Sequence, residues 1–468
     1  MRGRAGRPVL KRGDLEFLFE GRRLTAREGD TVAAALFANG VRVFGRSSKY
    51  HRPRGYRCGQ GHCSACAMRV DGLPGVRTCV TAVRAGMTVE REHAWPGADL
   101  DLLRAADLLS PLMPPGFYYR WFRRSPLLWG AFERGLASVA GQGRMPSRQA
   151  VDRLAAARCE RRAGPAVLVV GGGVAGLSAA LAAAEAGAGV LLVEQDDRLG
   201  GRLADAGETD TAARAADIAA QVETHEGIDA LTGAETIGWY EEAVVAIDRR
   251  PDLLLVTPAA VVLATGGYDL GLPFSGWDLP GVMLASGARR LLHRHGVMPG
   301  SRVVVLTTDD AGHHLARQLD AAGVQVACVA DCRPPQAIRQ GLRDEAAAMG
   351  VPLVAGALGA RAHGSNGVTA LALRHGANDG AGDRALRFDC DLVCISAGVR
   401  PADDLAYQAT SRGSLVLSPT EASDRASDEG PWLAGLVAGA RSADAAIAQG
   451  RAAGSAAARH ARAAADPA

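Results

Sequence analysis

The stretch AVLVVGGGVAG, residues 166–176, decides the fold of this chain. Five apolar residues that can form a buried strand precede glycines at positions 171, 173 and 176, and residues 177–186 have the composition of a helix. A second strand is predicted at residues 190–193, and Glu194 follows it. The order strand, Gly-x-Gly-x-x-Gly turn, helix, strand and acidic residue is that of a dinucleotide-binding unit.

Each position of this turn has a physical reason. Gly171 makes the tight turn, Gly173 lets a pyrophosphate approach the backbone, and Gly176 lets the helix pack on the strand. The helix N-terminus faces the anion, and Glu194 accepts a ribose hydroxyl. These features serve FAD and NAD equally, and a similar fold without a ligand is the alternative. The predicted contacts are Gly171, Gly173, Val174, Ala175, Gly176, Glu194, Gly200, Gly201, Arg202, Thr265 and Gly266.

A second strand–helix–strand unit is predicted from residue 302 to residue 330, but its turn lacks the glycine pattern. The turn reads TTDDAG at residues 307–312, which places two carboxylates where a pyrophosphate would lie. Repulsion between like charges argues against an NAD(P)H site there. We therefore expect a degenerate nucleotide-binding-like domain that is retained for packing.

Four of the nine cysteines lie close together, as Cys58-x4-Cys63-x2-Cys66-x12-Cys79. This is the spacing of plant-type [2Fe–2S] proteins, in which four thiolates bind two irons. Zinc and four unligated thiols are the alternatives; zinc sites usually combine two short pairs, whereas Cys79 is single and falls on a strand predicted at residues 77–81. We predict a [2Fe–2S] cluster held by these four cysteines.

The residues around the cysteines predict a small α+β domain. Residues 15–26 alternate as a hairpin, and Asp30 can cap a helix over residues 31–39. Further short strands are predicted near residues 67–70, 77–81 and 87–90, the order of a β-grasp ferredoxin-like fold. An α/β two-dinucleotide (Rossmann-like) flavoprotein fold follows. The predicted organisation is 1–95 for the [2Fe–2S] domain, 96–164 for a connector and subunit interface, 165–270 with 385–468 for the dinucleotide domain, and 271–384 for the degenerate domain.

Composition narrows the function further. The 468 residues carry a net charge of +3, which argues against a nucleic-acid-binding protein. The glycines within residues 166–193 mark this apolar stretch as strand, turn and helix rather than a transmembrane segment, and no secretory signal is found. We expect a soluble, cytoplasmic protein in a reducing compartment.

Two segments suggest contacts with partners. The basic run at residues 46–57 is either a docking surface or a solvated basic face. Residues 117–132, rich in aromatic side chains and arginine, favour a subunit interface over a membrane-surface helix. We find no convincing acid–base or nucleophile pattern, so no catalytic residue is predicted.

Four motifs carry a resemblance to a known family: GRSSKYHRPRG at residues 45–55, PLMPPGFYY at 111–119, LATGG at 263–267 and PGVML at 280–284. The chain resembles the α subunits of heterotetrameric sarcosine oxidase, of opine and proline dehydrogenases and of hydrogen cyanide synthase. The resemblance implies an oxidoreductase subunit that relays electrons from a partner, a FAD-dependent β-type amine or amino-acid oxidase or dehydrogenase subunit, to an electron acceptor.

The identity of the dinucleotide depends on a second position. In two-dinucleotide flavoproteins a Gly-Asp pair after the last strand binds the flavin ribityl chain, whereas this chain has AGAR at residues 438–441. FAD is the expected ligand and NAD the alternative. A self-contained NAD(P)H-dependent FAD/[2Fe–2S] reductase and a nucleotide-stabilised scaffold are the competing functions.

Overall fold

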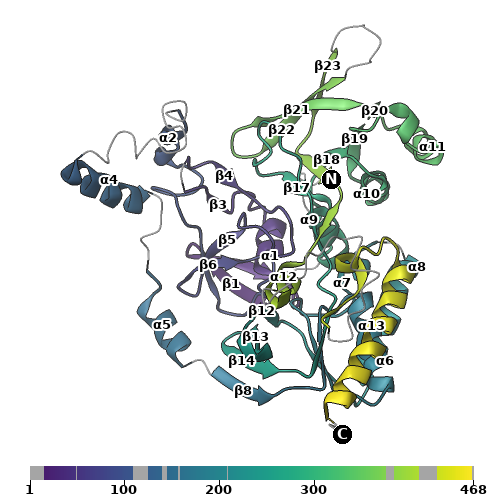
Figure 1. The fold of residues 1–468 in the computed structure, drawn as a ribbon. Helices are drawn as coiled ribbons and strands as arrows, with labels where there is room; N and C mark the ends of the chain where they lie inside the picture. Colours follow the sequence, from purple (N-terminus) through teal and green to yellow (C-terminus); the bar gives the residue numbers. More distant parts are fainter. Residues whose placement is uncertain are drawn as a thin grey trace. The chain divides into compact units, whose positions relative to one another are not determined.

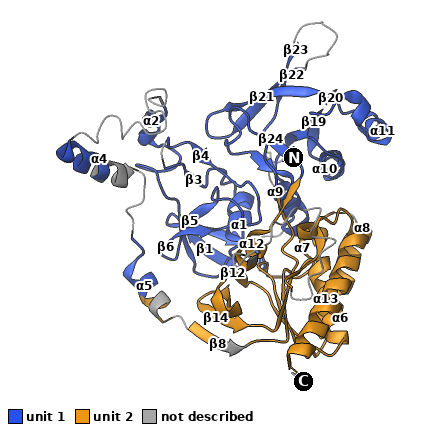
Figure 2. Cartoon of the chain, in the orientation of Figure 1, with its two compact units in different colours: residues 1–151, 269–398 blue, residues 152–268, 399–468 orange. Residues whose placement is uncertain are grey.

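The computed structural model describes residues 15–48, 50–108, 125–139, 145–156, 159–207, 209–375, 384–410 and 430–465. The chain divides into two compact units (Figure 2). Unit 1 comprises Met1–Val151 and Asp269–Gly398, and unit 2 comprises Asp152–Tyr268 and Val399–Ala468. Each unit is therefore built from two separate stretches of sequence.

The N-terminal part of unit 1 contains β1 (Leu15–Phe19), β2 (Arg22–Ala26), α1 (Val32–Ala38), β3 (Gly45–Arg46), β4 (Pro53–Arg54), β5 (Ala67–Val70), β6 (Leu73–Arg77) and β7 (Thr88–Glu90). Five of these strands form a mixed sheet in the order β2-β1-β7-β5-β6. β1 and β2 form the predicted antiparallel hairpin, and β1 and β7 are parallel. Helix α1 is buried over almost its whole length, because its sequence VAAALFA is apolar on every face. The predicted hairpin and helix are confirmed.

Two details of this domain differ from the sequence prediction. Thr31, not Asp30, caps α1: its hydroxyl accepts the amide of Ala34. The carboxylate of Asp30 instead accepts the amide of Arg27 and meets His295 at 3.2 Å. The predicted strand at residues 77–81 is also wrong in position, because β6 ends at Arg77 and Cys79 lies in the turn that follows.

The second part of unit 1 contains β17 (Val282–Leu284), α9 (Ala285–Arg289), a π-helix (Arg290–Arg294), β18 (Arg302–Thr307), α10 (Asp310–Ala321), β19 (Gln325–Asp331), α11 (Gln340–Ala348), β20 (Leu353–Ala355), β21 (Ala357–Gly364), β22 (Val368–His375), β23 (Arg384–Asp389) and β24 (Leu392–Ser396). Its parallel sheet has the order β17-β24-β18-β19-β20, and β21 to β23 form an antiparallel sheet of their own. The strand–helix–strand unit predicted after residue 302 is confirmed. β24 pairs with β18, so this sheet extends past the boundary expected at residue 384.

Unit 2 contains β8 (Cys159–Ala163), β9 (Val167–Val170), α6 (Val174–Glu185), β10 (Val190–Val193), α7 (Gly201–Ala204), α8 (Thr209–Thr224), β11 (Ile228–Leu231), β12 (Glu235–Trp239), β13 (Val245–Arg249), β14 (Asp252–Thr257), β15 (Ala260–Leu263), α12 (Asp404–Thr410), β26 (Trp432–Leu433) and α13 (Ala443–Ala465). A parallel sheet has the order β11-β10-β9-β15-β26. The predicted strand–turn–helix–strand is confirmed around β9. Residues 159–163, which fall in the predicted connector of residues 96–164, form a strand because they pair in parallel with β14.

Helix α13 packs closely against α6 in unit 2 (Figure 1). A Cβ on Gly450 would lie 2.1 Å from the carbonyl oxygen of Ala175, and one on Gly454 would lie 2.0 Å from that of Ala179. The two backbones approach this closely because both helices present alanine or glycine at the contact. The helix that begins at the glycine-rich turn is thus braced by the last helix of the chain.

The remaining elements are α2 (Ala105–Leu108), α4 (Pro126–Val139), α5 (Arg148–Ala155), β16 (Gly267–Asp269), β25 (Val399–Pro401) and the 3-10 helices Leu102–Arg104, Glu241–Ala243, Pro335–Ala337 and Gly435–Ala438. Residues 117–124 of the proposed interface segment lie outside the described residues. Within the described part of the chain, no helix is long and apolar enough to cross a membrane.

Candidate functional site

The four clustered cysteines lie in one small region of unit 1. Cys58, Cys63 and Cys66 belong to the loop between β4 and β5, and Cys79 comes from the turn after β6. Cys63 is half-buried and the other three are buried. The structure therefore brings together all four predicted ligands.

The sulfur atoms form a hydrogen-bonded chain. The Cys63 thiol donates to the Cys58 sulfur at 3.3 Å, and Cys79 interacts with both Cys58 and Cys66. Donation from Cys63 and Cys79 lowers the pKa of Cys58, and donation from Cys79 lowers that of Cys66. Backbone amides add to this, since Gly61 N–H donates to the Cys79 sulfur at 3.2 Å. The hydrogen bonds thus favour the thiolate form of Cys58 and Cys66, whereas donating these bonds and burial raise the pKa of Cys63 and Cys79.

The conformation of the loop depends on glycine at two positions. Gly59 has φ of +70° and Gly61 has φ of +76°, in the left-handed region that other residues seldom adopt. A Cβ on Gly59 would also lie 2.5 Å from the hydroxyl oxygen of Tyr56. The sharp turns at these glycines let the chain fold back so that its amides point toward the sulfurs.

The arrangement fits a two-iron cluster better than zinc. Among the described residues, no group of three or more His, Cys, Asp or Glu side chains is placed to hold a single metal ion. Zinc needs four ligands around one point, whereas a [2Fe–2S] cluster spreads four thiolates over two irons. The four sulfurs form a hydrogen-bonded chain, which suits thiolates that are spread over two irons better than thiolates gathered around one zinc.

The cluster loop is fixed from the other part of unit 1. The Ser286 hydroxyl donates to the carbonyl oxygen of Cys58 at 3.1 Å, and Leu284 N–H donates to that of Arg57 at 3.1 Å. A Cβ on Gly287 would lie 2.3 Å from the same Arg57 oxygen, so only glycine fits there. The junction of β17 and α9 therefore holds the cysteine loop in place, a contact that the sequence did not indicate.

The basic run next to the cysteines is largely paired within unit 1. Arg46 is buried and donates to the carbonyl oxygen of Ala98. Arg52 forms an ion pair with Asp107, and Arg54 forms one with Asp278. Arg57 stacks on the ring of Trp277. The sequence of residues 46–57 suggested a docking surface or a solvated basic face. Because most of these arginines are paired within unit 1, the run is neither a free docking surface nor a fully solvated face.

The dinucleotide turn connects β9 to α6 in unit 2. Gly171 has φ of +107°, and a Cβ there would lie 2.3 Å from the carbonyl oxygen of Ala264. A Cβ on Gly176 would lie 1.8 Å from the carbonyl oxygen of Gly171. Around Gly173, in contrast, no atom of the described residues outside the turn and its own helix backbone lies within 4 Å of the Cβ position. Gly171 and Gly176 are thus needed by the fold, whereas Gly173 leaves open space at the turn.

The N-terminus of α6 is available for an anion. Gly173 is its N-cap residue, and no side chain caps the first turn, which contains Val174 and Ala175. The lack of a side-chain cap and the helix dipole favour a negative group here, and a pyrophosphate fits both the open space and the charge. The residues present therefore fit a dinucleotide.

The second glycine pair lies directly beside this turn. Gly200 N–H donates to the carbonyl oxygen of Gly172 at 2.8 Å, and Gly173 and Gly200 form a parallel bridge. Gly200 and Gly201 both have positive φ, at +108° and +57°. Arg202 donates to the carbonyl oxygen of Gly267 at 3.5 Å. The predicted residues 200–202 are thus brought to the same place as the first turn.

Glu194 and Thr265 complete the surroundings of the turn. Glu194 is buried at the end of β10, and its carboxylate accepts the amides of Gly172 at 2.6 Å and Asp196 at 2.8 Å. Thr265 and Gly266 follow β15, where the Thr265 hydroxyl donates to the carbonyl oxygen of Ala402 at 2.6 Å. Glu194 therefore orders the turn itself, and a ribose hydroxyl would share this carboxylate.

Gly439 and Ala440 stand where a flavoprotein would have its Gly-Asp pair, so the aspartate of that pair is replaced by alanine. Gly439 has φ of +82° and Ala440 is buried. Asp444, in the first turn of α13, is paired with Arg214 of α8. A cavity of about 150 Å³ lies beside this pair, lined by Val174, Leu203, Asp210, Thr211, Arg214, Ala215, Ala443 and Ile447.

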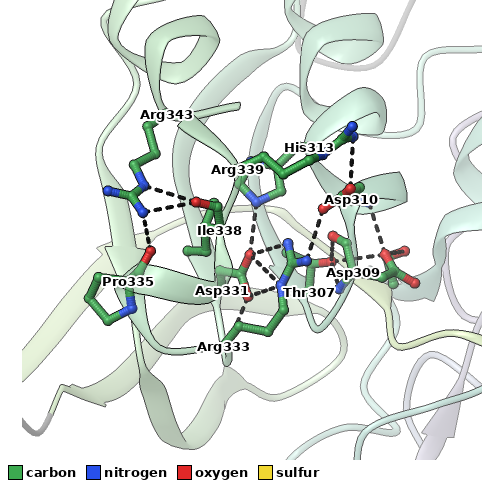
Figure 3. Close-up of polar contacts among 12 residues, drawn as sticks. Thr307, Asp309, Asp310, His313, Asp331, Arg333, Pro335, Ile338, Arg339 and Arg343 are labelled. Atoms are coloured by element: carbon green, nitrogen blue, oxygen red, sulfur yellow. Dashed lines mark hydrogen bonds and ion pairs between the residues drawn. The ribbon is translucent and has the colours of Figure 1, made fainter. Parts of the chain in front are cut away.

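The second turn, between β18 and α10, is filled by its own side chain (Figure 3). Asp309 caps α10 by accepting the amide of Gly312 at 3.2 Å. The same carboxylate accepts the Ser396 hydroxyl at 2.7 Å and the amide of Gly398 at 2.9 Å. The Asp309 carboxylate therefore occupies the N-terminus of α10, whereas the N-terminus of α6 is left open.

Behind this turn lies a network of ion pairs (Figure 3). Asp331, at the end of β19, accepts from His313 at 2.8 Å and pairs with Arg333 at 2.8 Å. Burial opposes ionisation of Asp331, but the hydrogen bonds from His313 and Arg333 lower its pKa below the usual value. Arg333 also pairs with Asp310. The polar groups of this strand edge thus satisfy one another.

Replacing Asp309 by alanine should destabilise the protein by about 2 kcal/mol, because the donors to its carboxylate lose their acceptor, among them the Gly312 amide that caps α10. Urea unfolding measures this change. Asp310→Ala is the control: it removes ion pairs of a partly exposed carboxylate and should cost less than about 1 kcal/mol. Equal costs for the two variants would contradict the role given to Asp309.

Sequence comparison agrees with this combination of sites. The class is an oxidoreductase that joins an iron–sulfur domain to a dinucleotide-binding fold. A model of the 2Fe-2S iron-sulfur cluster binding domain matches residues 13–94, and a model of the pyridine nucleotide-disulphide oxidoreductases matches residues 165–450. The chain belongs to the pyridine nucleotide-disulphide oxidoreductase family, and the predicted fold class is confirmed.

Among curated proteins, the chain is 32% identical to the sarcosine oxidase subunit alpha of Rhizobium meliloti (strain 1021) over 84% of its length. It is 29% identical to that of Corynebacterium sp. (strain P-1) over 87%. It covers 40% and 39% of these two relatives. Hydrogen cyanide synthase subunit HcnA of Pseudomonas aeruginosa is 39% identical over 18% of this chain and 79% of that protein. The predicted family resemblance is confirmed.

One solved structure shares the fold over most of the chain. The L-proline dehydrogenase from P. horikoshii superimposes with a TM-score of 0.65 at 20% identity. The match covers 95% of this chain and 73% of that one. At this identity the likeness concerns the fold alone.

Proposed function

We propose that this chain is the [2Fe–2S]- and dinucleotide-binding subunit of a heteromeric amine or amino-acid dehydrogenase or oxidase. The observation that carries the proposal is that one chain contains both the group of four close cysteines and the open glycine-rich turn at the N-terminus of α6. The curated relatives named as subunits of sarcosine oxidase and hydrogen cyanide synthase support a partner polypeptide. Sarcosine, D-amino acids, proline and opines are the substrate classes to test.

The cluster would be held by Cys58, Cys63, Cys66 and Cys79. When bound, it would supply one-electron transfer between a flavin on the partner and an electron acceptor. The chain's own residues hold it: the amides of Gln60 and Gly61 donate to ligand sulfurs at 3.5 and 3.2 Å, and Ser286 fixes the loop. These contacts lower the cost of concentrating negative charge in a buried site.

The dinucleotide would lie across the turn of residues 171–176, with its pyrophosphate at the N-terminus of α6. Gly200, Gly201 and Arg202 would face it from the second turn, and Thr265 and Gly266 from the end of β15. FAD is the proposed ligand, and NAD the alternative because no carboxylate stands at Ala440. Mass spectrometry of the ligand released from pure protein decides between them.

A self-contained NAD(P)H-dependent reductase is the competing function. It requires a second nucleotide site, and the turn after β18 is the place where the fold would offer one. There the carboxylate of Asp309 takes the hydrogen bonds that a phosphate would need. This favours a chain that receives its electrons from a partner.

The chain alone should not oxidise an amino acid. Purified by itself it should reduce artificial dyes poorly with sarcosine, proline, D-amino acids or opines, because its sequence shows no convincing acid–base or nucleophile pattern. Co-expression with a FAD-dependent subunit of the amine oxidase type should give a stable complex with activity. Size-exclusion chromatography and dye reduction measure both results, and turnover by the isolated chain would overturn the proposal.

A further inference from the structure

The hydroxyl of Tyr56 is a buried polar group that the contacts described so far leave unexplained. Tyr56 is 2% exposed, and its hydroxyl has no hydrogen-bond partner within the described part of the chain. A buried donor that is left unpaired destabilises the fold, so such a group calls for an acceptor that is not part of the polypeptide.

The ring of Tyr56 is held in one orientation. It makes edge-on contacts with Phe37 and Phe44, at centroid distances of 6.0 and 6.4 Å. All three side chains belong to the same hydrophobic core. Because the ring is fixed on two sides by aromatic neighbours, the hydroxyl has little freedom to turn toward another acceptor.

The hydroxyl points into the cysteine loop. Its oxygen lies 2.5 Å from the place where a Cβ on Gly59 would be, directly beside the turn between Cys58 and Gln60. It also lies within electrostatic range of Cys58, Cys66 and Cys79. A donor placed here, among three of the four thiols and without a protein acceptor, faces the volume that the cluster would fill.

We propose that Tyr56 donates a hydrogen bond to a sulfide of the [2Fe–2S] cluster and thereby sets the reduction potential of the cluster. This inference rests on the proposed function, which places the cluster at these cysteines. Hydrogen bonds to the sulfurs stabilise the more negatively charged reduced state, so the donor raises the potential. Tyr56 acts as a positioning and tuning residue, not as a ligand.

The test is Tyr56→Phe, which removes the hydroxyl and keeps the ring. The variant should retain its iron and acid-labile sulfide, and its midpoint potential, titrated by EPR, should fall. We expect about a tenfold change in the reduction equilibrium constant, which is about 59 mV for a one-electron couple. Tyr50→Phe is the matched control, since Tyr50 stacks on Arg52 outside the cysteine loop and its loss should leave the potential unchanged.

The outcomes separate the two proposals. A protein without iron refutes the cluster site itself. A normal cluster whose potential is the same in Tyr56→Phe refutes only the role of Tyr56. If Tyr56→Phe loses its cluster, the test is made on the unmutated chain produced with 3-fluorotyrosine in place of tyrosine. Fluorination makes the Tyr56 hydroxyl a stronger hydrogen-bond donor, so the midpoint potential of the cluster should rise. An unchanged potential in that protein overturns the inference.

Discussion

Cys63→Ser should abolish the iron–sulfur centre. Cys63 is the one half-buried thiol of the four, and its hydroxyl replacement is a poorer ligand for iron. The variant should lose its visible absorption, its reduced-state EPR signal and nearly all of its iron, which in the parent protein should be about two per chain.

Cys159→Ser serves as the control, because Cys159 is exposed on β8 in unit 2 and should contribute nothing to the centre. Protein purified without oxygen is needed, so that loss of iron reflects the substitution alone. Stoichiometric zinc with no iron in the parent protein would reject the cluster and favour the zinc alternative.

Gly173→Ala should remove the bound dinucleotide and leave the fold intact. The Cβ position at Gly173 is free of protein atoms, and its φ of −74° is accessible to alanine. The added methyl group would therefore occupy the space through which the pyrophosphate approaches the helix. We expect at least about 100-fold weaker binding, about 2.7 kcal/mol, with an unchanged unfolding transition.

Two other glycines make this test specific. Gly189→Ala also places a methyl group in open space, but away from the turn, and should bind normally. Gly176→Ala should instead destabilise the protein, since its Cβ would collide with the backbone of Gly171. Full nucleotide content in Gly173→Ala, measured on protein as purified, would show that the turn is not the binding site.

The sequence predicted the parts of the fold that depend on local pattern. The glycine-rich turn and the hairpin of β1 and β2 each contain their own signal, in the spacing of glycines or in alternation. Residues 159–163 carry no such signal: their arginines suit a solvated helix, and only the partner strand β14, far along the chain, makes them a strand.

In the candidate sites, too, the sequence predicted the features that have a local signal and missed those that depend on residues far apart in the chain. The spacing of the cysteines predicted which thiols meet, because these ligands lie within one short loop and the following turn. The basic run was open to misreading, because Asp107 and Asp278, which pair with Arg52 and Arg54, are distant in sequence. The role proposed for Tyr56 also depends on tertiary packing: its sequence signal is only a tyrosine two residues before Cys58.

The contact between α6 and α13 has a consequence for biosynthesis. The turn at residues 171–176 lies in the first half of the chain, but the helix it begins is braced by Gly450 and Gly454. During translation, about 270 residues are therefore added after α6 begins before α13 is synthesised and can pack on it. Contacts between segments so far apart in the chain form slowly. A ribosome-bound chain stalled before residue 443 should expose the apolar alanines of α6, and a chaperone that binds such surfaces should associate with this nascent chain.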